Sequence, residues 1–342
     1  MSKIIKVIFC LFLGFIFLLL LISFFVLGSI SKKLGQPSNY LFNTFRTASK
    51  TNPYLGKDKI NFIILGLDKR DDILEKTETT DTVIFASLNL KNYQIKTISI
   101  PRDLWFYDIN AKVNEIYPLS LKESDKFSFI KNKFQKLINQ NIDNVVVLST
   151  DNLINFVKLI GGVDLVLDQG FKDTKYPNPE YIKNPSSKIS IYKTIEFKAG
   201  PIHLDEFNIT EFVRSRKGGE TITQGGTDLA RTKRQQLLLE AILTKVKSGQ
   251  FINNGSQLVS LYQFWNKDLT KDITDTNILQ IFSLFDENYN EINLNKIDLT
   301  IGTNAKNGVI YHPNTFINKQ WVFIPSDPEY KQLQQFIETA IN

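Results

Sequence analysis

The chain has 342 residues, a net charge of +6, and the apolar and charged fractions of a globular protein. Its one cysteine, Cys10, excludes an intrachain disulfide, and its two histidines, His203 and His312, do not form the spaced pair of a zinc site or a histidine-based triad. We therefore expect chemistry based on Asp, Glu and Arg side chains with a hard cation such as Mg²⁺.

An apolar run from Val7 to Ser31 contains no charged residue and is long enough to cross a bilayer as one helix. We expect residues 1–31 to form a short tip and a transmembrane helix. Lysines on both sides of the run leave its orientation open. A cleaved signal peptide is the alternative, although the run is longer than the usual apolar region of such peptides and no A-x-A-like site follows. Residues 32–58 predict a juxtamembrane linker, with a short helix at Tyr40–Ser49.

Apolar runs and capping residues predict the elements of a globular domain that starts near residue 59. Residues 59–250 form its main part, and residues 251–342 continue it with further α/β elements. In chain order we expect strands at 61–66, 82–89 and 95–100, a helix at 126–139, a strand at 144–148, a helix from Asp151 to Ile160, a strand at 163–167, a loop at 173–187, helices from Asp205 to Phe212 and from Thr227 to Lys247, a helix at 275–285, and strands at 297–301 and 321–324. This alternation predicts an α/β layered domain with a central mixed β-sheet flanked by helices.

The predicted strand order gathers carboxylates at one sheet edge. The second and third strands would form a hairpin whose open end places Asp81 opposite Asp103. Asp68 follows the first strand, and a loop would return the chain to the same edge, with Arg70 and Arg102 close by. Gathered carboxylates favour a cation between them, and oxygen ligands suit Mg²⁺ or Mn²⁺. Strand-end polar residues paired with nearby arginines are the alternative interpretation.

Arginines gather around the start of the predicted helix at 227–247. Arg231 and Arg234 lie in its first two turns, where cations oppose the helix dipole, and Arg214 and Arg216 precede it. A bound anion would remove this conflict, and four guanidinium groups could clamp a pyrophosphate. A solvated basic surface or a nucleic-acid patch is the alternative. We expect no nucleic-acid partner, because the segment lacks aromatic interleaving and a recognised binding fold.

Seven short motifs occur in one order along the chain. They are Asn61–Arg70 (NFIILGLDKR), Thr80–Thr82 (TDT), Ser99–Asp103 (SIPRD), Lys112–Asn114 (KVN), Ile160–Val163 (IGGV), Val213–Arg216 (VRSR) and Asp228–Gln235 (DLARTKRQ). Each motif alone is weak, whereas seven in this order are specific. Over about residues 60–250 the chain resembles the LytR-CpsA-Psr family of bacterial envelope phosphotransferases, and the single N-terminal apolar run also fits that family.

The resemblance implies a single-pass cell-membrane protein with a cytoplasmic tip and an extracytoplasmic catalytic domain. Such proteins move a glycopolymer, with one phosphate, from a polyprenyl-pyrophosphate carrier onto a sugar hydroxyl of peptidoglycan. The implied partners are the polyprenyl-pyrophosphate-linked glycopolymer, peptidoglycan and the lipid bilayer, and the implied cofactor is Mg²⁺ (or Mn²⁺). A polyprenyl-pyrophosphate pyrophosphatase and a non-catalytic polyprenyl-lipid-binding envelope regulator are the alternatives.

The resemblance also assigns site residues. They are Arg102, Asp103, Asp228, Arg231 and Gln235 as catalytic residues, Arg70, Arg214 and Arg216 as substrate-binding residues, and Asp68 and Asp81 as metal ligands. Asp103 and Asp228 are both candidates for a general base.

Two positions depart from the family pattern. Thr79 stands where the family usually has Arg, so that Lys76 or Lys69 would have to replace a phosphate contact. The Gly-rich segment 217–227 is longer than expected, and would serve as a mobile lid or an acceptor-binding loop.

Overall fold

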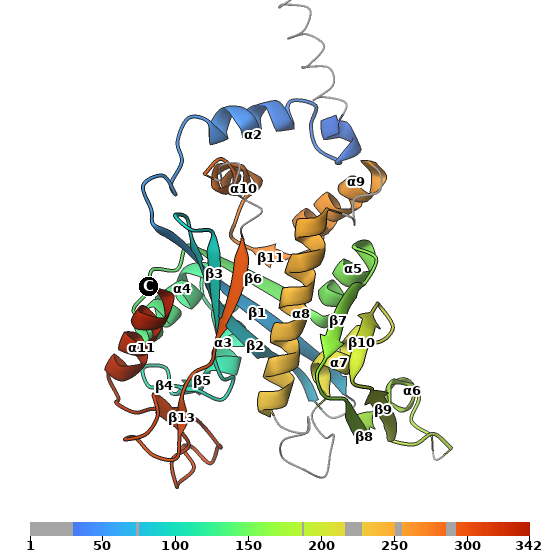
Figure 1. Cartoon of the computed structure of the whole chain (residues 1–342), viewed down its shortest axis with the longest axis vertical. Coiled ribbons are helices and arrows are strands. Elements are labelled where there is room, and N and C mark those ends of the chain that lie inside the picture. Colours follow the sequence, from blue (N-terminus) through green and yellow to red (C-terminus); the bar gives the residue numbers. More distant parts are fainter. Residues whose placement is uncertain (1–29, 73–74, 187, 216–227, 250–254, 285–291) are drawn as a thin grey trace, which may run out of the picture.

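A mixed six-stranded sheet forms the centre of the molecule, and helices cover both of its faces (Figure 1). The computed structural model describes residues 30–72, 75–186, 188–215, 228–249, 255–284 and 292–342. The strand order of the sheet is β11-β6-β1-β2-β3-β12. This arrangement confirms the predicted α/β layered domain with a mixed central sheet.

The long hairpin of β1 and β2 occupies the middle of the sheet. The six strands are β1 (Lys59–Asp72), β2 (Glu75–Asn89), β3 (Gln94–Ser99), β6 (Asn144–Ser149), β11 (Thr270–Lys271) and β12 (Asn293–Ile297). β2 runs antiparallel to β1 and β3, whereas β6 joins β1 and β12 joins β3 in parallel. The loop predicted after residue 66 was wrong. Both strands continue as a two-stranded extension, which the sequence concealed because polar residues replace the apolar run after Leu67.

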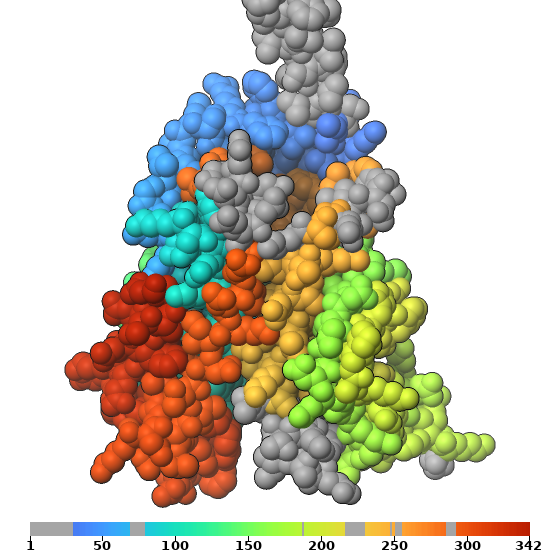
Figure 2. Space-filling model, viewed as in Figure 1, coloured from blue at the N-terminus to red at the C-terminus, as the bar shows by residue number. Residues whose placement is uncertain are grey.

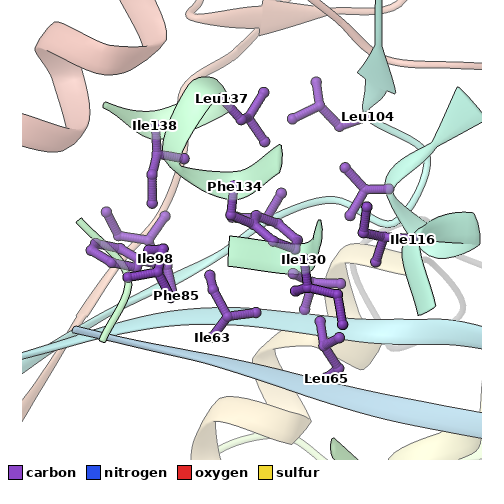
Figure 3. Packing of buried hydrophobic residues seen from close by; sticks show 14 of the residues in the cluster. Ile63, Leu65, Phe85, Ile98, Leu104, Ile116, Ile130, Phe134, Leu137 and Ile138 are labelled. Atoms are coloured by element: carbon purple, nitrogen blue, oxygen red, sulfur yellow. The ribbon is translucent and has the colours of Figure 1, made fainter. Parts of the chain in front are cut away.

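One sheet face packs against three helices and forms the largest core. The helices are α3 (Ile116–Ser120), α4 (Lys126–Ile138) and α11 (Lys331–Ile341). On α4 the fully buried residues Ile130, Phe134 and Leu137 recur at helical spacing. They share this core with Ile63 and Leu65 of β1 (Figure 3). The apolar stripe of α4 and the alternating strand residues therefore form one interior.

Helix α8 (Asp228–Ser248) covers the opposite face of the sheet. Gln236 Nε2 donates to Ser99 Oγ at 3.1 Å. Ser99 follows Ile98, which lies in the first core, and successive strand residues point to opposite faces. In Figure 1, α8 runs along the sheet with its first turn at the lower end of the view.

A second core lies beside α8. The elements around it are α5 (Thr150–Leu159), β7 (Val163–Leu167), β8 (Phe171–Pro177), β9 (Tyr192–Phe197), β10 (Gly200–Leu204) and α7 (Ile209–Arg214), and the short helix α6 (Pro179–Lys183) follows β8. The loop predicted at 173–187 was wrong, since β8 and α6 occupy most of it.

Two predicted helix starts also need correction. The helix expected from Asp205 begins at Ile209, because the Asp205 carboxylate accepts hydrogen bonds from the backbone of Phe207 and Asn208 and forms a turn instead. The N-cap of α5 is Ser149 rather than Asp151, since the Ser149 hydroxyl accepts from the Asn152 amide.

The short helix expected in the linker is present as α2 (Tyr40–Ala48), and it packs against α10 (Asp275–Phe282). The Asp275 carboxylate accepts hydrogen bonds from the Tyr40 hydroxyl, the Tyr262 hydroxyl at 2.7 Å and the Trp265 indole at 3.1 Å. Tyr262 belongs to α9 (Gly255–Gln263), which continues as a π-helix, η2 (Phe264–Asp268). One half-buried carboxylate thus ties the linker to the later part of the chain.

The C-terminal segments pack against the chain that follows β3. The short elements here are β4 (Trp105–Phe106), β5 (Ala111–Lys112), the 3₁₀ helix η1 (Val113–Glu115), β13 (Ile301–Gly302), β14 (Ile310–Tyr311) and β15 (Ile324–Pro325). Phe323 N donates to Asp103 O at 2.8 Å, and Trp105 N donates to Phe323 O at 2.9 Å. The stretch around Phe323 therefore lies directly beside the Ser99–Asp103 motif.

Residues 1–29, which hold most of the expected transmembrane run, lie outside the described residues. From residue 30 onward, no described helix is long and apolar enough to cross a bilayer. The transmembrane helix stays a prediction.

Candidate active site

A β-bulge presents Asp81. In the pairing of β1 with β2, Gly66 lies opposite Thr82 and Leu67 opposite Thr80, so Asp81 is the extra residue. A bulge re-aims one side chain and bends the strand. Gly66 is required at this point, because a Cβ added there would lie 2.9 Å from Thr82 Cβ.

Two arginines from distant parts of the chain meet the Asp81 carboxylate. Arg102, just after β3, donates to Asp81 Oδ1. Arg231, in the first turn of α8, donates to Asp81 Oδ2 at 3.5 Å and to the Asp81 carbonyl at 3.2 Å. Asp81 is 8% exposed and Arg231 is 4% exposed. The strand edge and the helix start therefore converge on one carboxylate.

Asp103 lies on the other side of Arg102. Asp103 Oδ2 is 3.5 Å from Arg102 Nε, and Asp103 Oδ1 is 2.8 Å from Lys112 Nζ. Arg102 thus joins Asp81 and Asp103, which agrees with their predicted closeness at the open end of the hairpin. Asp103 therefore helps to orient Arg102, and its expected role as a general base stays a prediction.

Asp68 pairs with a third arginine. Asp68 Oδ1 is 2.6 Å from Arg214 Nη2 at the end of α7, and Asp68 lies opposite Thr79 in the β1–β2 ladder. The Thr79 hydroxyl donates to Asp81 Oδ1 at 3.2 Å. Burial raises the pKa of the nearby Tyr176 to about 12, so this phenol is neutral at physiological pH.

Two further side chains of α8 hold the end of α7. Arg234 donates from Nε to Phe212 O at 2.9 Å and from Nη2 to Ser215 O, and it stacks over Phe171. Burial lowers the pKa of Arg234 to about 10, which still leaves it charged at neutral pH. Gln235 Nε2 donates to the Val213 carbonyl at 3.4 Å. Arg234 therefore holds the end of α7 through two backbone carbonyls, and its expected part in an anion clamp stays a prediction.

Sequence reasoning missed two contributors. Lys112 neutralises Asp103, and Asp173, which is 1% exposed, accepts a hydrogen bond from the Ser215 hydroxyl at 2.8 Å. The KVN motif was a signal for Lys112. No local pattern indicated Asp173, because its partner lies 42 positions away in the chain.

Several expected site residues lie outside the described part. They are Arg216, the segment 217–227, and the side chains of Arg70, Lys69, Lys76 and Asp228. Their predicted roles stay predictions.

The donor chemistry fits a magnesium ion that is completed by substrate oxygens. Among the side chains that the structure describes, no group of three or more His, Cys, Asp or Glu residues could hold a metal. Mg²⁺, however, is commonly bound through one or two carboxylates together with substrate phosphates and water. Asp68 and Asp81 supply two buried carboxylates, linked through Thr79, which lies opposite Asp68 and donates to Asp81.

Comparison with known proteins finds relatives along nearly the whole chain. The polyisoprenyl-teichoic acid–peptidoglycan teichoic acid transferase TagU of Bacillus cereus is 24% identical over 85% of this chain and 91% of its own length. The crystal structure of TagV from B. subtilis has a TM-score of 0.56 at 17% identity, over 84% of this chain and 98% of that one. TagT bound to LIIa-WTA has a TM-score of 0.51 at 18% identity, over 84% and 92%. These structural likenesses show a common fold. Because the LytR_cpsA_psr family model matches residues 31–338, which include every motif described above, the chain belongs to the LytR_cpsA_psr family.

Proposed function

We propose that the chain is a membrane-anchored phosphotransferase. It moves a glycopolymer from a polyprenyl-pyrophosphate carrier onto a sugar hydroxyl of peptidoglycan. The names of the curated relatives, which are teichoic acid transferases, support the reaction type and the acceptor. The apolar run Val7–Ser31 supports membrane anchoring, and a peptidoglycan acceptor calls for a catalytic domain outside the cytoplasm.

The main observation behind this proposal is that Arg102 and Arg231 both contact the buried Asp81 carboxylate. Guanidinium groups bind phosphate oxygens by paired hydrogen bonds, and their strength rises where water is excluded. Adding Arg214 and Lys112 gives four described cations against the carboxylates of Asp68, Asp81 and Asp103. The described cluster thus keeps an excess positive charge, which suits a pyrophosphate.

The chain's own residues would act mainly by positioning and by neutralising charge. Arg102 and Arg231 would hold the pyrophosphate, and Arg214 would stabilise the charge that develops on the leaving group. The acceptor oxygen forms a bond to the phosphorus next to the glycan. The bond from that phosphorus to the bridging oxygen breaks, and polyprenyl phosphate leaves. The acceptor proton passes to a base, for which Asp103 and Asp228 are the candidates.

A divalent cation would complete the site. Asp68 and Asp81 would hold Mg²⁺ (or Mn²⁺), which would neutralise phosphate oxygens in the transition state. We expect activity to disappear on chelation with EDTA and to return on addition of Mg²⁺. Undiminished turnover in EDTA would contradict this part of the proposal.

The direct test uses the full chain in lipid nanodiscs with a polyprenyl-pyrophosphate-linked glycan and peptidoglycan. Transfer releases one polyprenyl phosphate for every glycan phosphate that becomes linked to the wall. Polyprenyl phosphate released with free glycan phosphate would instead identify a pyrophosphatase. Binding of the donor without turnover would identify a non-catalytic lipid-binding protein, and either result would refute the transferase.

A further inference from the structure

Three aromatic rings stand in a row on the C-terminal segment. The rings of His312 and Trp321 stack with centroids 4.6 Å apart, and Trp321 meets Phe323 edge to face at 4.7 Å. Trp321 is 41% exposed, and Phe316, in the loop between them, is 65% exposed. We call His312, Phe316, Trp321 and Phe323 the aromatic platform. Contiguous exposed apolar side chains can mark a binding surface.

The platform adjoins the candidate active site. Phe323 is hydrogen bonded through its backbone to Asp103 at 2.8 Å, and the Asp103 carboxylate contacts Arg102. Trp321 is two residues before Phe323, so its backbone lies at most about 7 Å further along the chain. Figure 2 shows the C-terminal segments, in orange to red, as a surface lobe at the lower left. The platform is therefore anchored at the edge of the candidate site.

The local backbone holds Trp321 outward. Asn318 and Lys319 adopt positive φ angles of 49° and 62°, which form a tight turn closed by paired backbone hydrogen bonds between Ile317 and Gln320. Val322, which directly follows Trp321, is fully buried in a small core. The exposed ring is thus presented by a turn on one side and an anchored residue on the other.

The chemistry of the platform fits a sugar. A pyranose has a flat face of C–H groups, which packs on an aromatic ring, and a rim of hydroxyls that needs hydrogen-bonding partners. The His312 Nδ1 lies 2.8 Å from the Val322 carbonyl, so Nδ1 donates and Nε2 of the neutral ring is an acceptor. The exposed amide of Asn318 and the half-buried amide of Gln320 precede Trp321 in the sequence. These are the partners that a sugar rim requires.

The placement disfavours a membrane contact for these rings. Figure 1 shows α2, which follows the apolar run in the sequence, at one end of the molecule, and β13 at the opposite end. A surface that inserts into the bilayer would be expected near the anchor instead.

We propose that the aromatic platform binds a sugar ring of the acceptor glycan strand, and so aligns the strand with the pyrophosphate held by Arg102. This inference rests on the proposed transferase function. The chemical class of the ligand is an N-acetylated hexosamine chain.

Binding can be measured without turnover. The probe is the β-1,4-linked tetramer of N-acetylglucosamine, titrated into the full chain by calorimetry. We expect Trp321→Ala to weaken binding about tenfold, the loss of roughly one aromatic stacking contact. Trp321→Phe should recover part of the affinity. Phe207→Ala, which removes a phenylalanine that is 81% exposed outside the platform, should have no effect.

Trp321 also gives its own optical signal, because it is the most exposed of the three tryptophans and Trp105 is only 2% exposed. The tetramer should therefore change the fluorescence of the wild type and leave that of Trp321→Ala unchanged. Absence of tetramer binding by the wild type, or equal affinity in Trp321→Ala, would overturn the inference.

The transfer assay then identifies the source of the sugar. An acceptor role predicts that Trp321→Ala raises the KM for peptidoglycan and leaves the KM for the glycolipid donor unchanged. A rise in the donor KM alone would assign the platform to the donor glycan and contradict the acceptor assignment. Lack of transfer by the wild type would refute the proposed function, while the tetramer titration would still decide whether the platform binds sugar.

Discussion

Replacing Arg102 by alanine separates a catalytic role from a structural one. Arg102 bonds the buried Asp81 carboxylate, and its own side chain is 20% exposed. In Arg102→Ala, Asp81 keeps its contact with Arg231. Loss of one charged hydrogen bond to a buried partner should therefore lower the free energy of unfolding by about 1–3 kcal/mol.

The expected loss of activity is larger. Removing one preorganised donor from a developing negative charge typically lowers kcat by about 10²–10³, or roughly 3–4 kcal/mol. A domain with a stability of about 5–15 kcal/mol stays folded after losing 1–3 kcal/mol. Unfolding therefore cannot account for a hundredfold loss of turnover, and the two effects can be read independently.

The assay measures polyprenyl phosphate released in nanodiscs, and thermal unfolding is followed by circular dichroism on the same preparations. Arg102→Lys keeps the charge but loses the paired donors, so its turnover should fall between those of wild type and Arg102→Ala. Arg46→Ala removes an exposed arginine of α2 and should match the wild type in both measurements. Wild-type turnover in Arg102→Ala would refute the assigned role of this arginine.

Further predictions concern stability. Phe134→Ala should lower the free energy of unfolding in urea by about 3–5 kcal/mol, because its ring is fully buried. The exposed control Phe207→Ala should lower it by at most about 0.5 kcal/mol, and an equally small loss in Phe134→Ala would contradict the described core. Asp275→Ala and Tyr40→Phe should show a coupling energy of about 0.5–3 kcal/mol in a double-mutant cycle, and additive effects would exclude the linker contact. Burial raises the pKa of Tyr176 from 10 to about 12, so its stabilising contribution is complete below pH 10 and is lost as the pH rises towards 12. Between pH 10 and 12, the free energy of unfolding of Tyr176→Phe should fall less than that of the wild type. Parallel curves of unfolding free energy against pH would contradict the raised pKa.

The candidate site was predictable where its residues follow directly from local elements. Asp81 and Arg102 flank a hairpin that the apolar runs and the turn residues predict, so their contact follows from strand pairing. The contact of Asp81 with Arg231 spans 150 positions, and only the order of the motifs suggested it. The salt bridge between Asp68 and Arg214 and the use of Arg234 to hold backbone carbonyls were beyond sequence reasoning.

Local patterns in the sequence determined most elements of the layered domain. Apolar residues recur every two positions in strands and about every 3.6 in helices, because burial of one face requires that spacing. They also determined which residue types could perform the chemistry. Only the tertiary structure decided that β1 and β2 continue past residue 66 with a bulge at Asp81, and that Phe323 lies beside Asp103. The physical reason is that such contacts join segments whose separation in sequence carries no periodic signal, so that they form only when the whole domain packs.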